Sequence, residues 1–176
     1  VIFDSYLTTS QIQQVESYLI DTYGYAIPGS SASVPNPYMQ LEAVNYNTDI
    51  KVWEDSSGNN RDATTVRGVP SVVTNAPGNG SSKNVTAVKG GTTAGITLAN
   101  EQLANYTFCY VARYAGTSRG RILDAYTENW MSGFYNTTTD LAYHNNWTAN
   151  ARGTSNTNWL YACDSVNDYI SNSGSR

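Results

Sequence analysis

The stretch YTFCYVARY, residues 106–114, decides the fold, because it alternates between two apolar faces. Successive side chains of an extended strand point to opposite sides of a sheet. One side would carry Phe108, Tyr110, Ala112 and Tyr114, and the other would carry Cys109, Val111 and Arg113. Both sides are largely apolar at the centre, which is typical of an inner strand covered on both faces. The stretch therefore predicts a layered β structure.

Six further runs have the composition of short strands and are separated by clusters of Gly, Asn, Asp and Ser. They are KNVTAVKG (83–90), GITLA (95–99), GRILDAY (120–126), WMSGFYN (130–136), LAYHNNW (141–147) and NWLYACDSV (158–166). Short β-rich runs at this spacing are typical of an all-β sandwich. We therefore expect an antiparallel β-sandwich over residues 41–176, preceded by one N-terminal amphipathic helix.

That helix is predicted to follow a short strand at residues 1–7, VIFDSYL. Thr8 is expected to be its N-cap, and Gln11 three residues later would complete a capping box. Apolar residues then recur at spacings of three and four, which places them on one face of a helix. This docking face consists of Ile12, Val15, Leu19 and Tyr23.

A segment rich in Pro and Ser, residues 27–40, separates the helix from the sandwich. Proline disfavours both helices and strand ladders, so this segment reads as a linker or an extended loop. The sequence thus divides into a strand and docking helix at 1–26, the linker at 27–40 and the sandwich at 41–176.

The charge of the chain restricts its partners. Only 14 % of the residues are charged, against about 25 % in an average soluble protein, and the net charge is -4. So few cations cannot form a basic patch, which disfavours nucleic acid and anionic membrane surfaces as partners. No apolar run approaches the roughly 18 residues that a membrane span requires, so membrane insertion is not expected.

The order of the strand-like runs resembles the concanavalin A-like lectin/glucanase superfamily, in particular its laminin G-like jelly-roll domains. The segment VWEDSSGNNRDAT (52–64) is similar to the early Trp-x-Asp-x-Ser-Gly-Asn turn of that family. It is followed in family order by the runs at 83–91, 95–99, 106–114, 120–126, 130–136 and 158–166. The resemblance covers residues 41–176. It implies a jelly-roll sandwich in a secreted, cell-surface or virion-surface protein.

Residues 1–26 resemble the last strand and the terminal helix of such a domain, although here they come first. After residue 166 the pattern of the family calls for further strands. Two interpretations follow. Either the chain holds the tail of one tandem copy and the front of the next, or residues 1–24 are exchanged with a neighbouring subunit. Both make neighbouring copies or adjacent domains the expected partners.

Trp53, Asp55 and Gly58 are predicted to build a structural turn. The Asp55 carboxylate would accept the following backbone amides, Gly58 would take a positive φ, and Trp53 would anchor the turn. The oxygen-bearing residues here resemble a calcium loop only superficially, since Asn60 and Val66 replace its Gly and its bidentate Glu. The residues therefore predict no metal and no cofactor, and Ca²⁺ is implied by the resemblance alone.

Catalysis is disfavoured. Some members of the superfamily are glycosidases, which need two carboxylates about 5 to 10 Å apart, but their Glu-x-Asp-x-x-Glu strand motif is absent here. The chain has one histidine, His144, with no Cys or Asp at nearby metal-ligand spacing. A zinc site or a His-based triad therefore lacks partners in the sequence.

Aromatic and amide side chains gather across the runs 130–136 and 141–147. They are Trp130, Tyr135, Tyr143, His144, Asn145 and Trp147. Flat apolar rings beside neutral hydrogen-bonding groups suit a sugar ring, so these residues are candidates for carbohydrate binding. The alternative is that the aromatic residues fill the core and that His144 is a polar surface residue.

Five Asn-x-Ser/Thr sequons favour a secretory route and are candidates for N-glycosylation. They begin at Asn79, Asn84, Asn105, Asn136 and Asn146. A chain rich in Asn, Ser and Thr also produces sequons by chance. Cys109 and Cys163 both fall in strand-like runs, so they either form a cross-strand disulfide or remain two buried thiols.

The leading interpretation is a non-catalytic module with a structural or assembly role in a larger glycosylated fibre or coat, located outside the cell or on a cell or virion surface. The alternative is a lectin-like, carbohydrate-binding adhesion domain. A glycoside hydrolase of the same fold is third.

Overall fold

A computed structural model describes residues 1–23, 36–98, 103–125, 127–144, 146–149, 157–166, 168–171 and 174–175. Within these ranges the chain is all-β apart from one helix, α1 (Thr9–Tyr23), and its strands pair antiparallel. The strands are β1 (Ile2–Phe3), β2 (Leu41–Asn47), β3 (Val52–Asp55), β4 (Ala63–Arg67), β5 (Ser71–Asn75), β6 (Val85–Lys89), β7 (Gly95–Thr97), β8 (Thr107–Ala112), β9 (Leu123–Asp124), β10 (Trp130–Tyr135), β11 (Thr138–His144), β12 (Trp147–Ala149), β13 (Leu160–Ser165), β14 (Tyr169–Ser171) and β15 (Gly174–Ser175). No helix in the described ranges has the length and apolar character that crossing a membrane requires.

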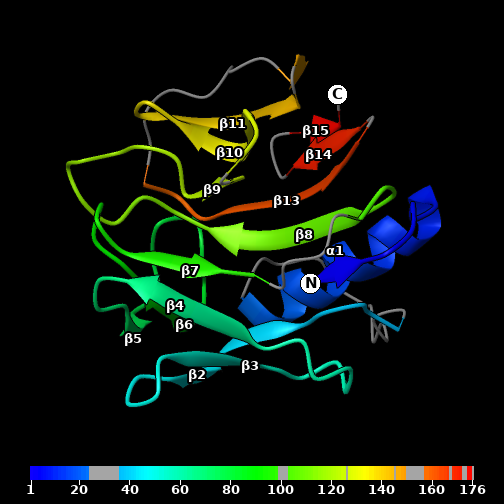
Figure 1. The fold of residues 1–176 in the computed structure, drawn as a ribbon. Helices are drawn as coiled ribbons and strands as arrows, with labels where there is room; N and C mark the ends of the chain where they lie inside the picture. The colour runs from blue at the N-terminus through cyan, green and yellow to red at the C-terminus, as the bar shows by residue number, and fades with distance from the viewer. Residues whose placement is uncertain are drawn as a thin grey trace.

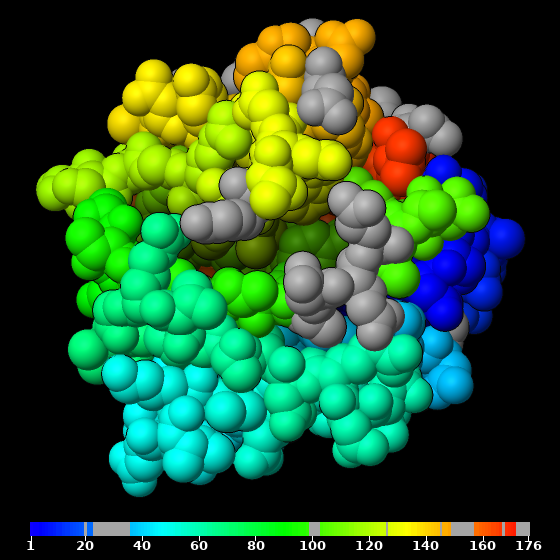
Figure 2. Space-filling model, viewed as in Figure 1, coloured from blue at the N-terminus to red at the C-terminus, as the bar shows by residue number. Residues whose placement is uncertain are grey.

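The strands form three sheets and a hairpin. Their orders are β1-β8-β13-β14-β15, β12-β11-β10-β9, β2-β3-β4-β7 and the pair β5-β6. Strands β8 and β13 cross the middle of the molecule, with β9, β10 and β11 on one side and β2, β3, β4 and β7 on the other (Figure 1). The space-filling view shows the same division, with cyan and green residues below, yellow and orange residues above, and the blue N-terminal residues at one edge (Figure 2).

Strand β8 is covered on both faces, as its sequence predicts. Its residues Phe108, Tyr110 and Ala112 pack in one core cluster with Phe134 of β10 and Leu160 of β13. The alternate residues Cys109 and Val111 belong to a second cluster that contains the apolar residues of α1. The five-stranded sheet therefore has the β10–β11 layer on one face and the helix on the other.

The start of α1 shows the predicted capping box. Thr8 Oγ1 accepts a hydrogen bond from the Gln11 amide at 3.3 Å, and Gln11 Oε1 accepts one from the Thr8 amide at 2.9 Å. Val15 and Leu19 are buried against Phe3 and the two cysteines, and Ile12 packs beside them. The side chain of Tyr23, the fourth predicted docking residue, lies outside the described residues.

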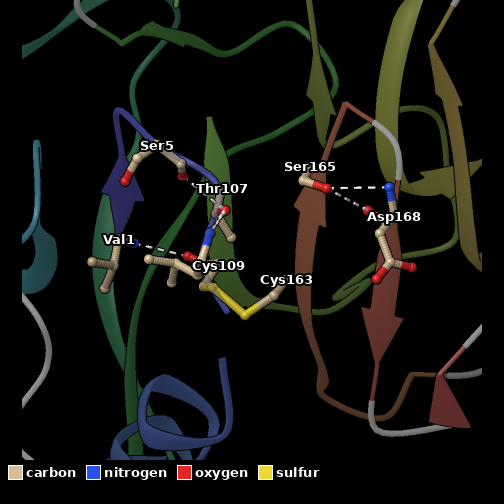
Figure 3. The surroundings of a disulfide bond; sticks show 8 residues. Val1, Ser5, Thr107, Cys109, Cys163, Ser165 and Asp168 are labelled. Atoms are coloured by element: carbon tan, nitrogen blue, oxygen red, sulfur yellow. Dashed lines mark hydrogen bonds between the residues drawn. A yellow bond between two sulfur atoms is a disulfide. The ribbon is translucent and has the colours of Figure 1, made fainter. Parts of the chain in front are cut away.

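Cys109 and Cys163 form a disulfide, one of the two alternatives that the sequence leaves open (Figure 3). The two residues lie directly opposite each other in the antiparallel pairing of β8 with β13. The amide of Cys109 donates to the Val1 carbonyl on the other side of β8, so Cys109 and Cys163 are a non-hydrogen-bonded pair. Side chains approach most closely at such pairs, which suits a cross-strand disulfide.

Residues 1–23 pack on the sheet of their own chain. Strand β1 pairs with β8, with Ile2 opposite Phe108, and Ile2 also forms a β-bridge with Met39. Residues 24–35, which include most of the predicted linker, lie outside the described residues. The division of the chain at 27–40 between two copies or two subunits remains a prediction.

Candidate functional site

The predicted sugar-binding residues are split between the two faces of the β9–β12 sheet. Tyr143 and His144 are consecutive on β11, so their side chains point to opposite faces. Strand pairing places Trp130 opposite His144 and Trp147 opposite Tyr143. We call Trp130 and His144 the inner pair, and Tyr143 and Trp147 the outer pair. The alternation of side chains along LAYHNNW already indicates this split between two faces. The sequence prediction nevertheless treats the residues as one group.

The outer pair lies beside the turn between β11 and β12. The rings of Tyr143 and Trp147 meet edge to face, with centroids 5.2 Å apart and an interplanar angle of 79°. Trp147 keeps 46 % of its surface exposed. Asn146 is exposed in the same turn, where its carbonyl accepts from the His144 amide at 2.8 Å. An open apolar ring thus lies next to a neutral side-chain amide.

Among the described residues, Tyr135 does not join the outer pair. The exposed ring of Tyr135, at the end of β10, lies 5.6 Å from the Arg121 guanidinium in a cation–π contact. The same guanidinium donates to Asn129 at 2.8 Å. Asn145 lies outside the described residues. The only described aromatic contact of the outer pair is therefore the one between its own two rings.

The inner pair faces the β8–β13 sheet. The His144 and Trp130 rings stack with an interplanar angle of 7° and centroids 5.6 Å apart. Nε2 of His144 lies 3.1 Å from Oδ2 of Asp164, a fully buried residue of β13. The Trp130 indole donates to the Tyr106 hydroxyl at 2.7 Å. The inner pair is thus engaged by the neighbouring sheet and does not form an open sugar platform.

Both ring nitrogens of His144 face acceptors. Nδ1 lies 3.1 Å from the Thr148 hydroxyl and 3.4 Å from the Val166 carbonyl, while Nε2 faces the Asp164 carboxylate. A carbonyl and a carboxylate only accept hydrogen bonds, so the doubly protonated imidazolium satisfies this arrangement best. Burial lowers the pKa of His144, but the hydrogen bond and charge of Asp164 and the Val166 carbonyl raise it by more.

Asp164 is the residue that sequence reasoning missed. It lies 20 positions from His144 and on a different sheet, so no local spacing joins the two. Burial raises the pKa of Asp164, and the His144 hydrogen bond and charge oppose that shift only in part. Its Oδ1 atom is buried and has no hydrogen-bond partner among the described residues. The carboxylate therefore depends on the His144 imidazolium for its main compensation.

Two more polar contacts connect the same two sheets. The hydroxyls of Tyr110 on β8 and Ser132 on β10 are 2.8 Å apart. Ser171 on β14 donates to the buried Asp140 of β11 at 2.5 Å. Together with the His144–Asp164 pair, these contacts fix how the β10–β11 layer sits on the five-stranded sheet, since partnered buried polar groups specify one arrangement of a core.

The segment around Asp55 is a hydrogen-bonded turn. The Asp55 carboxylate accepts from the backbone amides of Gln40, Ser57 and Arg61 and from the Ser57 hydroxyl. Burial raises the pKa of Asp55, but these hydrogen bonds together lower it. Gly58 has φ +87°, and the Trp53 indole donates to the Glu42 carbonyl at 2.7 Å.

This turn offers little to a calcium ion. Both carboxylate oxygens of Asp55 already accept hydrogen bonds, and Oδ1 of Asp62 accepts the Asp55 amide at 2.8 Å. In the described part of the chain, no three His, Cys, Asp or Glu residues are grouped so that they could hold a metal. The calcium site implied by the resemblance thus has no ligand set among these residues.

The five sequon asparagines are all exposed. They are Asn79, Asn84, Asn105, Asn136 and Asn146. Asn136 has φ +43° in the turn between β10 and β11, and Asn146 lies in the next turn along the chain. An exposed asparagine in a turn is accessible to a modifying enzyme and leaves room for a glycan.

The chain was compared with protein-family models, curated proteins and solved structures. None matches it. The likeness to concanavalin A-like domains thus remains an interpretation of the sequence, and the functional argument depends on the residues described above.

Proposed function

We propose that this chain is a disulfide-bonded, N-glycosylated β-sandwich module, of jelly-roll type, with a structural or assembly role in an extracellular, cell-surface or virion-surface protein. The observation that carries the proposal is the Cys109–Cys163 disulfide, which joins β8 to β13 on the face of the five-stranded sheet that α1 covers. Structural disulfides persist in oxidising compartments and are rare in the cytosol. The exposure of all five sequon asparagines supports the same location.

The assembly role is supported by the edges of the sheets. Among the described residues, β9 and β12 are the outer strands of one sheet and β2 and β7 of another. Edge strands present unpaired backbone groups, to which a strand of a neighbouring copy can pair. The shortage of charged side chains also removes the repulsion that usually keeps such edges apart.

The location is tested by secretion of the chain from a eukaryotic host, followed by intact mass before and after deglycosylation and reduction. We expect a mass increase from glycans and a further mass change of one disulfide on reduction. Secreted protein that lacks either modification would contradict the proposal. Light scattering over a range of concentrations tests assembly, and a monomer at every concentration would remove that role.

Carbohydrate binding is the second candidate function, and the outer pair favours it. An exposed Trp147 ring beside Tyr143 and an amide is a suitable platform for the C–H face of a sugar. Retention on immobilised glycans should then fall in Trp147→Ala. The matched control is Tyr135→Ala, which removes an exposed aromatic ring from the same sheet. Equal retention of both variants and the wild type would exclude this site.

A further inference from the structure

The outer pair and one sequon occupy the same turn. Tyr143 and Trp147 are opposite each other in the pairing of β11 with β12, and Asn146 directly precedes Trp147 in the turn between them. Asn146 thus lies within a few residues of both rings along a tight hairpin. Its side chain is exposed, and so is nearly half of Trp147.

The hydrogen bonding of Asn146 leaves its amide nitrogen available. Oδ1 accepts a hydrogen bond from the Trp147 amide at 2.9 Å, and Nδ2 makes no hydrogen bond to another described residue. N-glycosylation uses Nδ2 alone. The C1–phosphate bond of a lipid-diphosphate oligosaccharide donor breaks, a C1–Nδ2 bond forms, and one amide proton is released. The Oδ1 hydrogen bond, and with it the turn, survives this change.

We propose that the Tyr143–Trp147 pair binds the first N-acetylglucosamine of the chain's own glycan on Asn146. This inference depends on the proposed function in one respect, that the sequons are glycosylated. The chemistry is that of a sugar on an aromatic platform, with the apolar C–H face against the exposed ring. Because the sugar is covalently attached one residue from Trp147 and three residues from Tyr143, it meets the rings at high effective concentration.

Another sequon offers a matched contrast. Asn84 is exposed as well, but its neighbours in sequence are Lys83 and Val85, neither of which is aromatic. A glycan on Asn84 therefore lacks the local ring surface that Asn146 has. If the outer pair binds the Asn146 glycan, that glycan covers the two rings in the glycosylated chain. Free glycans then bind to the rings only when Asn146 is unmodified.

The test is a cycle of variants secreted from a eukaryotic host. Asn146→Gln and Asn84→Gln are each made in the wild type and in Trp147→Ala, with the glycans trimmed to one N-acetylglucosamine. The same proteins from a non-glycosylating host show how much each substitution changes Tm in the absence of glycans. Glycopeptide mass spectrometry measures occupancy, calorimetry measures Tm, and the cycle isolates the coupling between glycan and ring.

We expect Asn146 to be occupied and its glycan to raise Tm by about 2 to 4 °C in the wild type, the size of one good contact in a chain of this length. In Trp147→Ala this gain should vanish, whereas any effect of the Asn84 glycan should not depend on Trp147. An occupied Asn146 with the same gain in both backgrounds overturns the inference. So does an unmodified Asn146 beside other occupied sequons, which leaves the proposed function intact. Secreted protein without any glycan overturns both.

Discussion

Nε2 of His144 and Oδ2 of Asp164 are 3.1 Å apart and join a strand of the β9–β12 sheet to a strand of the five-stranded sheet. Asp164 is fully buried, and within the described ranges only the Oδ2 atom of its carboxylate has a hydrogen-bond partner. A buried carboxylate is costly without a positive charge beside it. The packing of these two sheets is therefore linked to the protonation of one histidine.

The contribution of the His144–Asp164 pair to stability should decrease as the pH rises above about 6.5, whereas the buried Val1 amino group, with its pKa lowered to about 5, contributes the opposite trend. The folded chain raises the pKa of His144 above its ordinary value of 6.5, so the folded state holds this proton more tightly than the unfolded state. The resulting stability is present below pH 6.5 and is lost as the pH rises through the folded pKa. The raised pKa of Asp164 acts in the same direction. Tyr106, with its pKa raised to about 12 by burial, stays neutral throughout.

Urea unfolding at about pH 6 and about pH 9 checks this linkage. The matched control is the double variant His144→Gln with Asp164→Asn, which keeps polar groups in place and removes both titrations. Between the two pH values the wild type should lose free energy of unfolding relative to this double variant. An equal change in both proteins would assign the dependence to other groups.

Removal of the disulfide should destabilise the chain strongly. The bond joins residues 54 positions apart, and closing a loop of this length restricts the unfolded chain by about 4 kcal/mol in the entropic account. The double variant Cys109→Ala with Cys163→Ala should therefore unfold at a much lower urea concentration. A loss below about 1 kcal/mol would show that the bond is dispensable for the fold.

Leu19→Ala should weaken the docking of α1. Leu19 is 4 % exposed and packs in the cluster that contains Cys109 and Cys163. Truncation of a buried leucine costs about 2 to 5 kcal/mol. Gln13, which is exposed on the same helix, is the control, and its replacement by alanine should change stability by less than about 0.5 kcal/mol. Equal effects would mean that the predicted apolar stripe does not hold the helix.

Asp55→Ala should destabilise the turn at neutral pH by about 1 to 3 kcal/mol, because several backbone amides lose their acceptor. The hydrogen bonds lower the pKa of Asp55 below 3.8. Its contribution is thus present above pH 3.8 and is lost as the pH falls through the folded value. The difference in the free energy of unfolding between wild type and variant, measured by chemical unfolding, should become smaller in acid. Glu54→Ala, at an exposed neighbour, should match the wild type.

Local patterns in the sequence predicted local structure well. The alternation of residues 106–114 placed Tyr110 and Cys109 on opposite faces of β8, where the two core clusters lie. The spacing of Thr8 and Gln11 predicted the capping box of α1. Such features are predictable because steric and hydrogen-bonding rules act over a few neighbouring residues. Strands β2, β3, β4, β5, β14 and β15 fall outside the predicted strand-like runs, although ATTVR of β4 and SVVTN of β5 are rich in the β-branched residues that strands favour.

The chemistry of the candidate site could be predicted only in part. The residues around the β11–β12 turn were identified, but the sequence does not show that His144 meets Asp164, because the stacking of two sheets creates that contact. Through this contact His144 is not an isolated surface residue, while its role as a sugar ligand stays a prediction. Contacts between sheets depend on how distant segments pack, which no single spacing encodes.

The Cys109–Cys163 bond also determines how the module responds to a pulling force. An extended chain gains about 3.4 Å per residue, so a crosslink that spans 54 positions withholds about 180 Å of contour length from stretching. Under tension applied outside this span, β8, β13 and the strands between them remain tethered. Each such unit in a fibre would then have a covalent limit to its elongation, which reduction of one bond removes.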